Sequence, residues 1–588
     1  MEPTGILSAT ARSSFESESP TPGRNGRNIG VWSRPSLLAA YFGLYLLAYV
    51  TSLEGQVTLN LTVFAASAFQ AHSLVSTVYV VGGVVFSVAK PIMAKVADVF
   101  GRFKAFSLCA ALLTLGYITQ AASGNFKIFT ASSVFYSAGA TGLQILQQIF
   151  IADTSTLRNR AILSTIPDIP FVVNVWIGAP LASLILQGPG WRWGYGIWAI
   201  ILPITFLPLA FSLLREKQIV QKSVLQKPFV VSAEARMKRS IWHELDAGGL
   251  LLLTVAISLI LIPLTLQKDG QDGWGIISIG SMLILGLASL VAFWFWERDP
   301  RLAPRPFFPA HLSKDRTVLA GFGISFFFAA VYYLSVFPYF QSYLLVVSGE
   351  SVASAGQIVQ LYVFVSTITA IIVSFLIKFV HRYKYFVVSG SCIYSLGCVL
   401  TAIYRIETAS RSTIVLCQIA IGIGGGLMVV PAQLGVQASV SHGEVATTTA
   451  LFLTTLEIGG AAGSSLAGAI WAHDVPPKLQ QYLPQDTKNQ ASVIFGNITL
   501  ASTGWPTGDP TRAAIIRAYQ ETMTKMLIAA VCACVPLVPL SLMMKNHKLD
   551  EMDQNDKDAA IGGDQELADF DEREPLARDS CDSRTGED

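Results

Sequence analysis

Three carboxylates interrupt stretches of sequence that are otherwise strongly apolar: Glu54, Asp168 and Glu457. An ionised side chain inside a lipid bilayer is costly, so it usually serves an ion pathway or a structural pair. A carboxyl group suits proton transport, because desolvation raises its pKa toward the working pH and contact with water lowers it again. We rank these residues as candidate proton carriers in the order Asp168, Glu54, Glu457. The alternative for each is a structural ion pair or an interfacial position.

Uncharged polar side chains also recur at helical spacing within apolar stretches. Tyr45 and Tyr49 lie four residues apart, and so do Gln144 and Gln148. Residues four apart share one face of a helix. These four side chains are therefore candidates for the lining of a substrate cavity, and packing between helices is the alternative.

The elements that position these residues are membrane-spanning helices. A chain that is 52% hydrophobic, only 14% charged and has a mean hydropathy of +0.50 is too apolar for soluble domains of ordinary composition. An apolar helix of about twenty residues crosses the bilayer, which makes membrane lipid an expected partner. We predict about fourteen spans, near residues 36–56, 74–93, 105–121, 128–150, 161–186, 194–214, 247–266, 275–295, 317–345, 353–377, 385–404, 412–432, 446–471 and 525–543.

The positions of Lys and Arg predict the orientation of these spans. Basic residues concentrate in four short loops that lie on one side and are sparse in the six short loops on the other side. Since basic loops stay in the cytoplasm, both termini are expected inside. The two Asn-X-Ser/Thr sequons, at Asn60 and Asn497, then fall on the outer side and are candidate glycosylation sites.

A short motif follows the second predicted span and reads AKVADVFGRFK from Ala94. It resembles the loop signature of the major facilitator superfamily, G-x-L-A-D-x-x-G-R, with Ala94 in place of the first Gly. Asp98, Gly101 and Arg102 combine an acidic helix end, a turn glycine and a basic partner, which together predict a conformational latch. An ordinary basic inner loop is the alternative.

A weak internal repeat supports a two-half architecture. The segment Arg102-Phe-Lys-Ala-Phe aligns with Arg382-Tyr-Lys-Tyr-Phe, and each follows a predicted span. We therefore expect an all-α polytopic membrane protein with a major facilitator fold and helices arranged as 6+2+6. The expected divisions are a disordered N-terminus 1–35, a first bundle 36–214, a cytoplasmic loop 215–246, an inserted helix pair 247–295, a cytoplasmic loop 296–316, a second bundle 317–543 with an outer loop 472–524, and an acidic cytoplasmic tail 544–588.

Several longer stretches of the sequence carry a narrower resemblance. They are SAFQAHSL from Ser67, AKVADVFGRFKAF, GLQILQQIFIADTSTLRNR, WRWGYG, and the outer-loop element PKLQQYLP, which contains Tyr482. Together they resemble the fungal siderophore-iron transporters. The resemblance covers roughly residues 36–543. It implies proton symport of an intact ferric siderophore of the hydroxamate type, with Tyr482 near its path. The membrane it implies is the plasma membrane, and an endosomal or vacuolar membrane is the alternative.

Three other classes of function are possible for such a chain: an antiporter, a receptor and an enzyme. A partial Gly-Pro element in span 5, Gly178-Ala-Pro180, would favour a proton antiporter that exports drugs or a thiol peptide. A nutrient-sensing receptor that does not transport would need a longer signalling extension than the tail of 544–588. The sequence contains no metal-ligand spacing, phosphate-binding loop or nucleophile–base pair, so we expect neither an enzyme nor a cofactor. The uneven charge distribution gives no indication of a nucleic-acid partner.

Overall fold

The computed structural model describes residues 34–154, 167, 169–224, 246–265, 276–299, 302–303, 312–380, 382–440, 445–506 and 508–546. Every regular element within these ranges is a helix. This is the structure that lipid imposes on a spanning chain, because a helix satisfies its backbone hydrogen bonds internally. The prediction of an all-α membrane fold is confirmed.

Within the described residues, the first half of the chain forms six long helices. They are α1 (Arg34–Ala68), α2 (Val75–Phe100), α3 (Arg102–Ala121), α4 (Phe126–Thr154), α6 (Ile169–Gln187) and α7 (Trp191–Val224), with a short 3-10 turn η1 (His72–Leu74) between the first two. A hairpin of two helices follows, α9 (Ala247–Thr265) and α10 (Ile276–Arg298). Asp246, which precedes α9, accepts a 2.7 Å hydrogen bond from the indole of Trp296 and so ties the hairpin together.

The second half begins with the turn η3 (Leu312–Lys314) and a helix that is broken in two, α11 (Arg316–Ser335) and α12 (Phe340–Val346). The helices that follow are α13 (Val352–Val380), α14 (Lys384–Tyr404), α15 (Arg411–Gln437), α16 (Val445–Tyr482), α19 (Pro510–Cys534) and α20 (Leu537–Met543). Three short elements connect α16 with α19: η5 (Lys488–Gln490), α17 (Ala491–Gly496) and α18 (Ile498–Thr503).

Eleven helices of the described part are long and apolar enough to cross a membrane. The helices α4, α9 and α16 occupy the positions of the three remaining predicted spans. Of these, α9 has a shorter apolar stretch, Gly248–Pro263. The positions of the helices are consistent with fourteen crossings, although the first residues of predicted span 5 lie outside the described residues.

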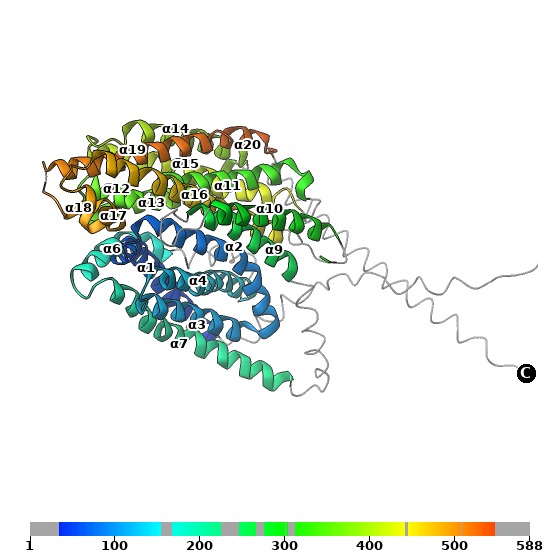
Figure 1. The fold of residues 1–588 in the computed structure, drawn as a ribbon. Coiled ribbons are helices and arrows are strands. Elements are labelled where there is room, and N and C mark those ends of the chain that lie inside the picture. The colour runs from blue at the N-terminus through cyan, green and yellow to red at the C-terminus, as the bar shows by residue number, and fades with distance from the viewer. Residues whose placement is uncertain are drawn as a thin grey trace, which may run out of the picture.

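The helices form two bundles, each around its own core. The core of the first contains side chains of α1, α3, α4 and α7, and that of the second contains side chains of α11 to α19. In Figure 1 the blue-to-cyan helices lie below the yellow-to-orange ones. The bundles meet along a seam where α2 packs on α16 and α6 packs on α13, and α9 covers α2 and α16 from one side.

Two predicted boundaries are corrected by the structure. The first span does not end near residue 56, because α1 continues to Ala68 and therefore includes Asn60. The predicted outer loop 472–524 is largely helical, since α16 continues to Tyr482 and α19 already begins at Pro510. Both errors have one cause: a 20-residue window cannot recognise a helix that extends beyond the bilayer.

The orientation of the helices leads to a labelling prediction. Gln70 and Gln490 are exposed at the end of the molecule predicted to face outward, and Lys104 is exposed near the other end. In a chain without its own cysteines, a single cysteine at position 70 or 490 is expected to react with an impermeant thiol reagent added to intact cells. A cysteine at position 104 is expected to react only after permeabilisation. The reverse pattern would contradict the orientation.

Candidate functional site

Glu54 lies on α1 inside the first bundle and is only 2% exposed. The Thr58 hydroxyl donates a 2.9 Å hydrogen bond to Oε1, and the Tyr136 hydroxyl lies 3.5 Å from Oε2. The Tyr117 hydroxyl lies beside the same carboxyl group. Among the described residues no Lys, Arg or His comes within ion-pair distance of it. Hydroxyl groups can stabilise either protonation state, so this environment suits a carboxyl group that gains and loses a proton.

Close packing of helices brings these hydroxyls to Glu54. A side chain at Gly116 of α3 would collide with the backbone of Tyr136 on α4, since an added Cβ atom would lie 2.7 Å from its nitrogen. The missing side chain lets the two helices approach, and the rings of Tyr117 and Tyr136 then stand 5.7 Å apart. Small residues commonly permit such approach in membrane helices.

Glu457 lies on α16 and is paired across the seam. Its Oε1 atom lies 3.3 Å from Nζ of Lys90 on α2, and both side chains are largely shielded, at 25% and 11% exposure. On the same two helices, the Thr454 hydroxyl donates a 3.3 Å hydrogen bond to the Ser87 carbonyl. The structure therefore places Glu457 in an ion pair that joins the two bundles. Asp168, our first candidate, lies outside the described residues.

The motif after α2 forms a tight connection to α3. Gly101 joins the two helices with φ of +87°, a conformation in which a side chain would be strained. Arg102 then donates from Nε to Oδ2 of Asp153, near the end of α4, at 2.8 Å. The side chain of Asp98 is not among those that the structure describes. The basic partner of the predicted latch is thus tied to α4.

A charge-removal experiment tests this latch. Replacing Asp153 with Asn keeps the shape of the side chain but removes the charge that holds Arg102. Because the pair is partly exposed, we expect a loss of about 1 kcal/mol or less in stability. Transport is expected to slow several-fold while substrate affinity stays unchanged. Wild-type transport rates in a stably expressed Asp153→Asn variant would show that the pair is not a latch.

The candidate cavity residues have different environments. On α1, Tyr45 is 38% exposed and Tyr49 is half-buried. On α4, Gln144 is exposed and Gln148 is half-buried. Tyr482, in contrast, donates its hydroxyl to both oxygens of Glu521 on α19, at 3.1 and 3.0 Å. It belongs to a charged cluster at the end of α16.

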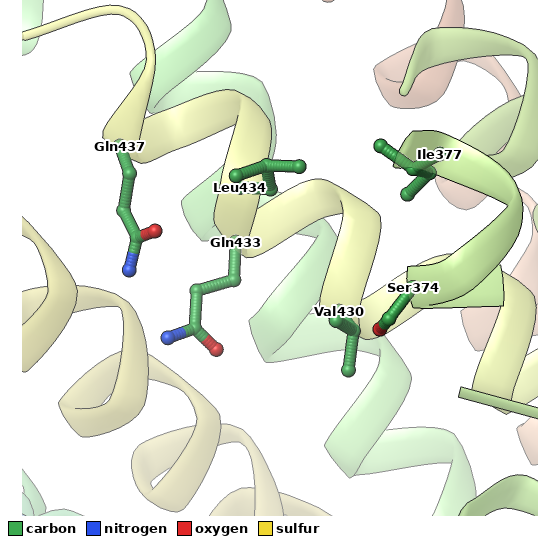
Figure 2. A pocket seen from close by; sticks show the side chains of 6 residues that line it. All are labelled: Ser374, Ile377, Val430, Gln433, Leu434 and Gln437. Carbon is green, nitrogen blue, oxygen red and sulfur yellow. The ribbon is translucent and has the colours of Figure 1, made fainter. Parts of the chain in front are cut away.

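A cavity of about 300 Å³ opens between α13 and α15. Figure 2 shows Gln433 and Gln437 projecting from one face of α15, with Ser374 and Ile377 on the neighbouring α13. Gln437 is anchored by a 2.9 Å hydrogen bond to the Thr449 hydroxyl of α16. These residues lie near the ends of α13 and α15 that are predicted to face the cytoplasm. This cavity offers amide donors and acceptors to a polar ligand.

Further contacts join the two bundles at the end predicted to face outward. The Tyr339 hydroxyl donates a 2.6 Å hydrogen bond to the Ser73 carbonyl. Gln341 of α12 donates to Oδ1 of Asn60 on α1 at 3.2 Å. Because both Tyr339 and Gln341 belong to the second bundle, separating the bundles at this end must break these bonds.

The two sequons differ in their environments. Asn60 is 2% exposed within α1, and its side-chain amide donates to the Gln56 carbonyl at 2.8 Å. A glycan has no room at this position, so Asn60 is a poor glycosylation candidate. Asn497 is half-buried, precedes α18 and caps that helix through its Oδ1 atom. It remains a candidate.

Several of these residues were not selected from the sequence: Lys90, Tyr117, Tyr136, Asp153 and Gln433. Lys90 did carry a signal, because it is a charged residue inside the predicted span 74–93. Asp153 is a charged residue just after the predicted span 128–150, within a stretch quoted for the resemblance, but its partner could not be read from the sequence. The Tyr and Gln residues carried no signal, since an isolated Tyr or Gln in an apolar helix does not reveal which neighbours it contacts.

Two helical bundles that meet along a seam, joined by buried contacts between α2 and α16 and between α1 and α12, have the architecture of a membrane carrier. The family model described as Major Facilitator Superfamily matches residues 35–280 and 270–464. Among solved structures, a bacterial homologue of the human lysosomal transporter Spinster, in an inward-facing and unoccupied conformation, superposes with a TM-score of 0.54. The two sequences are 12% identical, and the superposition covers 87% of this chain and 98% of the bacterial chain. This likeness shows the fold.

Curated fungal proteins match at much higher identity. The MFS siderochrome iron transporter C of Aspergillus fumigatus is 51% identical over 528 residues, which is 89% of this chain and 86% of that protein. The siderophore iron transporter mirC of Emericella nidulans is 49% identical over 526 residues, with the same shares. The chain belongs to the major facilitator superfamily and, within it, to the fungal siderophore-iron transporters. These relatives are named as transporters, so the chain is not an enzyme.

Proposed function

We propose that this protein imports ferric siderophores, of the hydroxamate type, by proton symport and alternating access. The environment of Glu54 supports proton coupling most directly. Glu54 is a buried carboxyl group that has hydroxyl neighbours and no cationic partner among the described residues. The names of the relatives support the substrate class, since they are siderophore and siderochrome iron transporters. Glu54 therefore replaces Asp168 as our first candidate, and Glu457 is a structural partner of Lys90.

Proton coupling provides the energy for accumulation. A neutral ferric hydroxamate gains nothing from the membrane potential, whereas each positive charge that moves with it gains about 2.3 kcal/mol per 100 mV. This corresponds to roughly 40-fold accumulation per 100 mV. A carboxyl group that binds a proton facing one side and releases it facing the other can supply that charge.

Alternating access uses the division into two bundles. We propose that the expected 6+2+6 arrangement holds, with α9 and α10 as the inserted pair. The bonds of Tyr339 and Gln341 would have to break for the bundles to separate at the end predicted to face outward. The Lys90–Glu457 pair would have to break for α2 and α16 to separate. Tyr45, Tyr49, Gln144 and Gln148 are retained as candidate contacts in the substrate path, and Tyr482 as a contact near its outer entrance.

The remaining assignments follow from this function. An importer that collects siderophore from the surroundings belongs in the plasma membrane, and an endosomal or vacuolar membrane is the alternative. Asn497 would then carry a glycan on the outer surface. Its partners are the ferric siderophore, protons and membrane lipid.

Uptake by cells that lack their own siderophore carriers tests this function. Cells expressing the protein are expected to accumulate radiolabelled iron from at least one ferric hydroxamate in a panel, and a protonophore is expected to abolish accumulation. Iron uptake that ignores the protonophore would contradict proton coupling. Proton-dependent efflux of a loaded compound without any uptake would favour the antiporter instead.

A further inference from the structure

Beyond the hydroxyl groups that surround Glu54, further buried hydroxyl groups lie in a row along α1. The Thr62 hydroxyl, two turns after Glu54, hydrogen bonds with the Tyr195 hydroxyl of α7 at 3.2 Å. Both side chains are buried, at 7% and 2% exposure. The Tyr195 and Thr62 hydroxyls both donate to the Thr58 carbonyl, at 3.5 and 2.8 Å, and the Thr58 hydroxyl binds Glu54. Tyr195 also lies close to Tyr136, whose hydroxyl is 3.5 Å from Oε2 of Glu54, so the row continues from Thr62 through Tyr195 to the surroundings of the carboxyl group.

The other end of this row reaches the seam. The Tyr79 hydroxyl of α2 lies beside Thr62 and Tyr195. The Tyr79 ring packs edge-on against Phe337, which belongs to the break between α11 and α12, with centroids 5.3 Å apart. Tyr339, whose hydroxyl donates to the Ser73 carbonyl across the seam, lies next to Tyr79. Tyr79 thus lies where the two bundles separate.

We propose that Thr62 and Tyr195 form a proton path between Tyr79, at the seam, and Glu54. The path rests on the proposed proton coupling and identifies how the carboxyl group is loaded. Each hydroxyl accepts a proton from one neighbour as it passes its own proton to the next, so no group is consumed. The Thr58 carbonyl cannot relay a proton, so the last transfer runs from Tyr195 to the neighbouring Tyr136 hydroxyl and from there to Oε2 of Glu54. When the bundles separate at this end, Tyr79 meets water and supplies the entrance.

The groups that face Glu54 come from four helices. Thr58 lies on α1 itself, Tyr117 on α3, Tyr136 on α4 and Tyr195 on α7. All of them are hydroxyl groups, and none is a stronger acid or base than Glu54. A proton on this path therefore ends at the carboxyl group, because a carboxylate is a stronger base than the hydroxyl groups along the path.

Two rates measured in vesicles test the path. Proteoliposomes with the full-length protein are loaded with a radiolabelled ferric trihydroxamate, and its exchange without a proton gradient is compared with uptake driven by an acidic exterior. Thr62→Val and Tyr195→Phe are expected to slow driven uptake about 10-fold or more, the usual scale for losing a proton-transfer group. Exchange is expected to stay within about twofold of wild type, since it needs no proton transfer.

The chain offers matched controls. Thr62→Ser keeps the hydroxyl and is expected to keep the driven rate. Thr51 lies on the same helix, but its hydroxyl bonds to the carbonyl of Leu47 at 2.9 Å within α1, so Thr51→Val is expected to behave as wild type.

The outcomes separate the path from the function. Driven uptake at wild-type rates in both Thr62→Val and Tyr195→Phe would overturn the path and leave proton symport standing. An equal loss of exchange and driven uptake would overturn it as well, because it would show that the hydroxyls only support the fold. Wild-type vesicles without any driven uptake would refute the proposed function, and the path with it.

Discussion

Replacing Glu54 with Gln is expected to abolish accumulation of ferric siderophore while the protein continues to exchange it. The amide has the shape of the protonated carboxyl group and can still accept from Thr58, but it cannot carry a proton. Wild-type protein is expected to accumulate substrate roughly 40-fold per 100 mV if one charge accompanies each siderophore. In the Glu54→Gln variant the ratio of inside to outside concentration is expected to fall to about 1, the value for a passive carrier.

An exposed glutamate provides the control for this variant. Glu407 lies in the turn between α14 and α15, and Glu407→Gln is expected to leave accumulation unchanged. Accumulation that persists in Glu54→Gln and remains sensitive to a protonophore would place the proton on another group. Asp168 would then be the next residue to replace.

Charge reversal at the seam is the second large effect that we expect. Lys90→Glu would set two carboxylates against each other at the position where Lys90 and Glu457 now pair. Removing one partner of a shielded pair leaves the other charge unpaired, and such pairs typically show coupling energies of about 0.5–3 kcal/mol in double-mutant cycles. We expect Lys90→Glu and Glu457→Lys each to slow transport about 10-fold, and the double variant to recover most of the rate.

Recovery in the double variant separates a pair from two independent residues. Lys127, exposed at the start of α4, supplies the control reversal, which is expected to have no effect on transport. If the losses of the two seam variants simply add in the double variant, the ion pair does not join the bundles in a state that matters for transport.

The sequence predicts the spanning helices well, because an apolar stretch of bilayer length has few other structures available to it. It fails where a helix extends past the lipid. The segment Gln56-Val-Thr-Leu-Asn60 lies beyond a bilayer-length window, yet it belongs to α1, where Asn60 donates to the Gln56 carbonyl and accepts from Gln341 of the second bundle. A contact from far along the chain is invisible to a local pattern.

The candidate site was only partly predictable for the same reason. The sequence indicates that Glu54 and Glu457 are unusual, but it does not distinguish them. Their environments differ because Lys90, which is 367 residues away in the sequence, pairs with Glu457. Among the described residues, Glu54 meets the hydroxyl of Thr58 on its own helix and those of Tyr117 on α3 and Tyr136 on α4, which no spacing rule would have assembled.

Proton entry that accompanies the siderophore tests the central claim most directly. Vesicles that contain the purified protein and a pH-sensitive dye are held at a negative internal potential, and a ferric trihydroxamate is added outside. We predict that the interior acidifies as labelled iron enters, and that the Glu54→Gln variant admits iron only down its concentration gradient and without acidification. Iron entry into wild-type vesicles with no proton movement, or with protons leaving, would contradict proton symport.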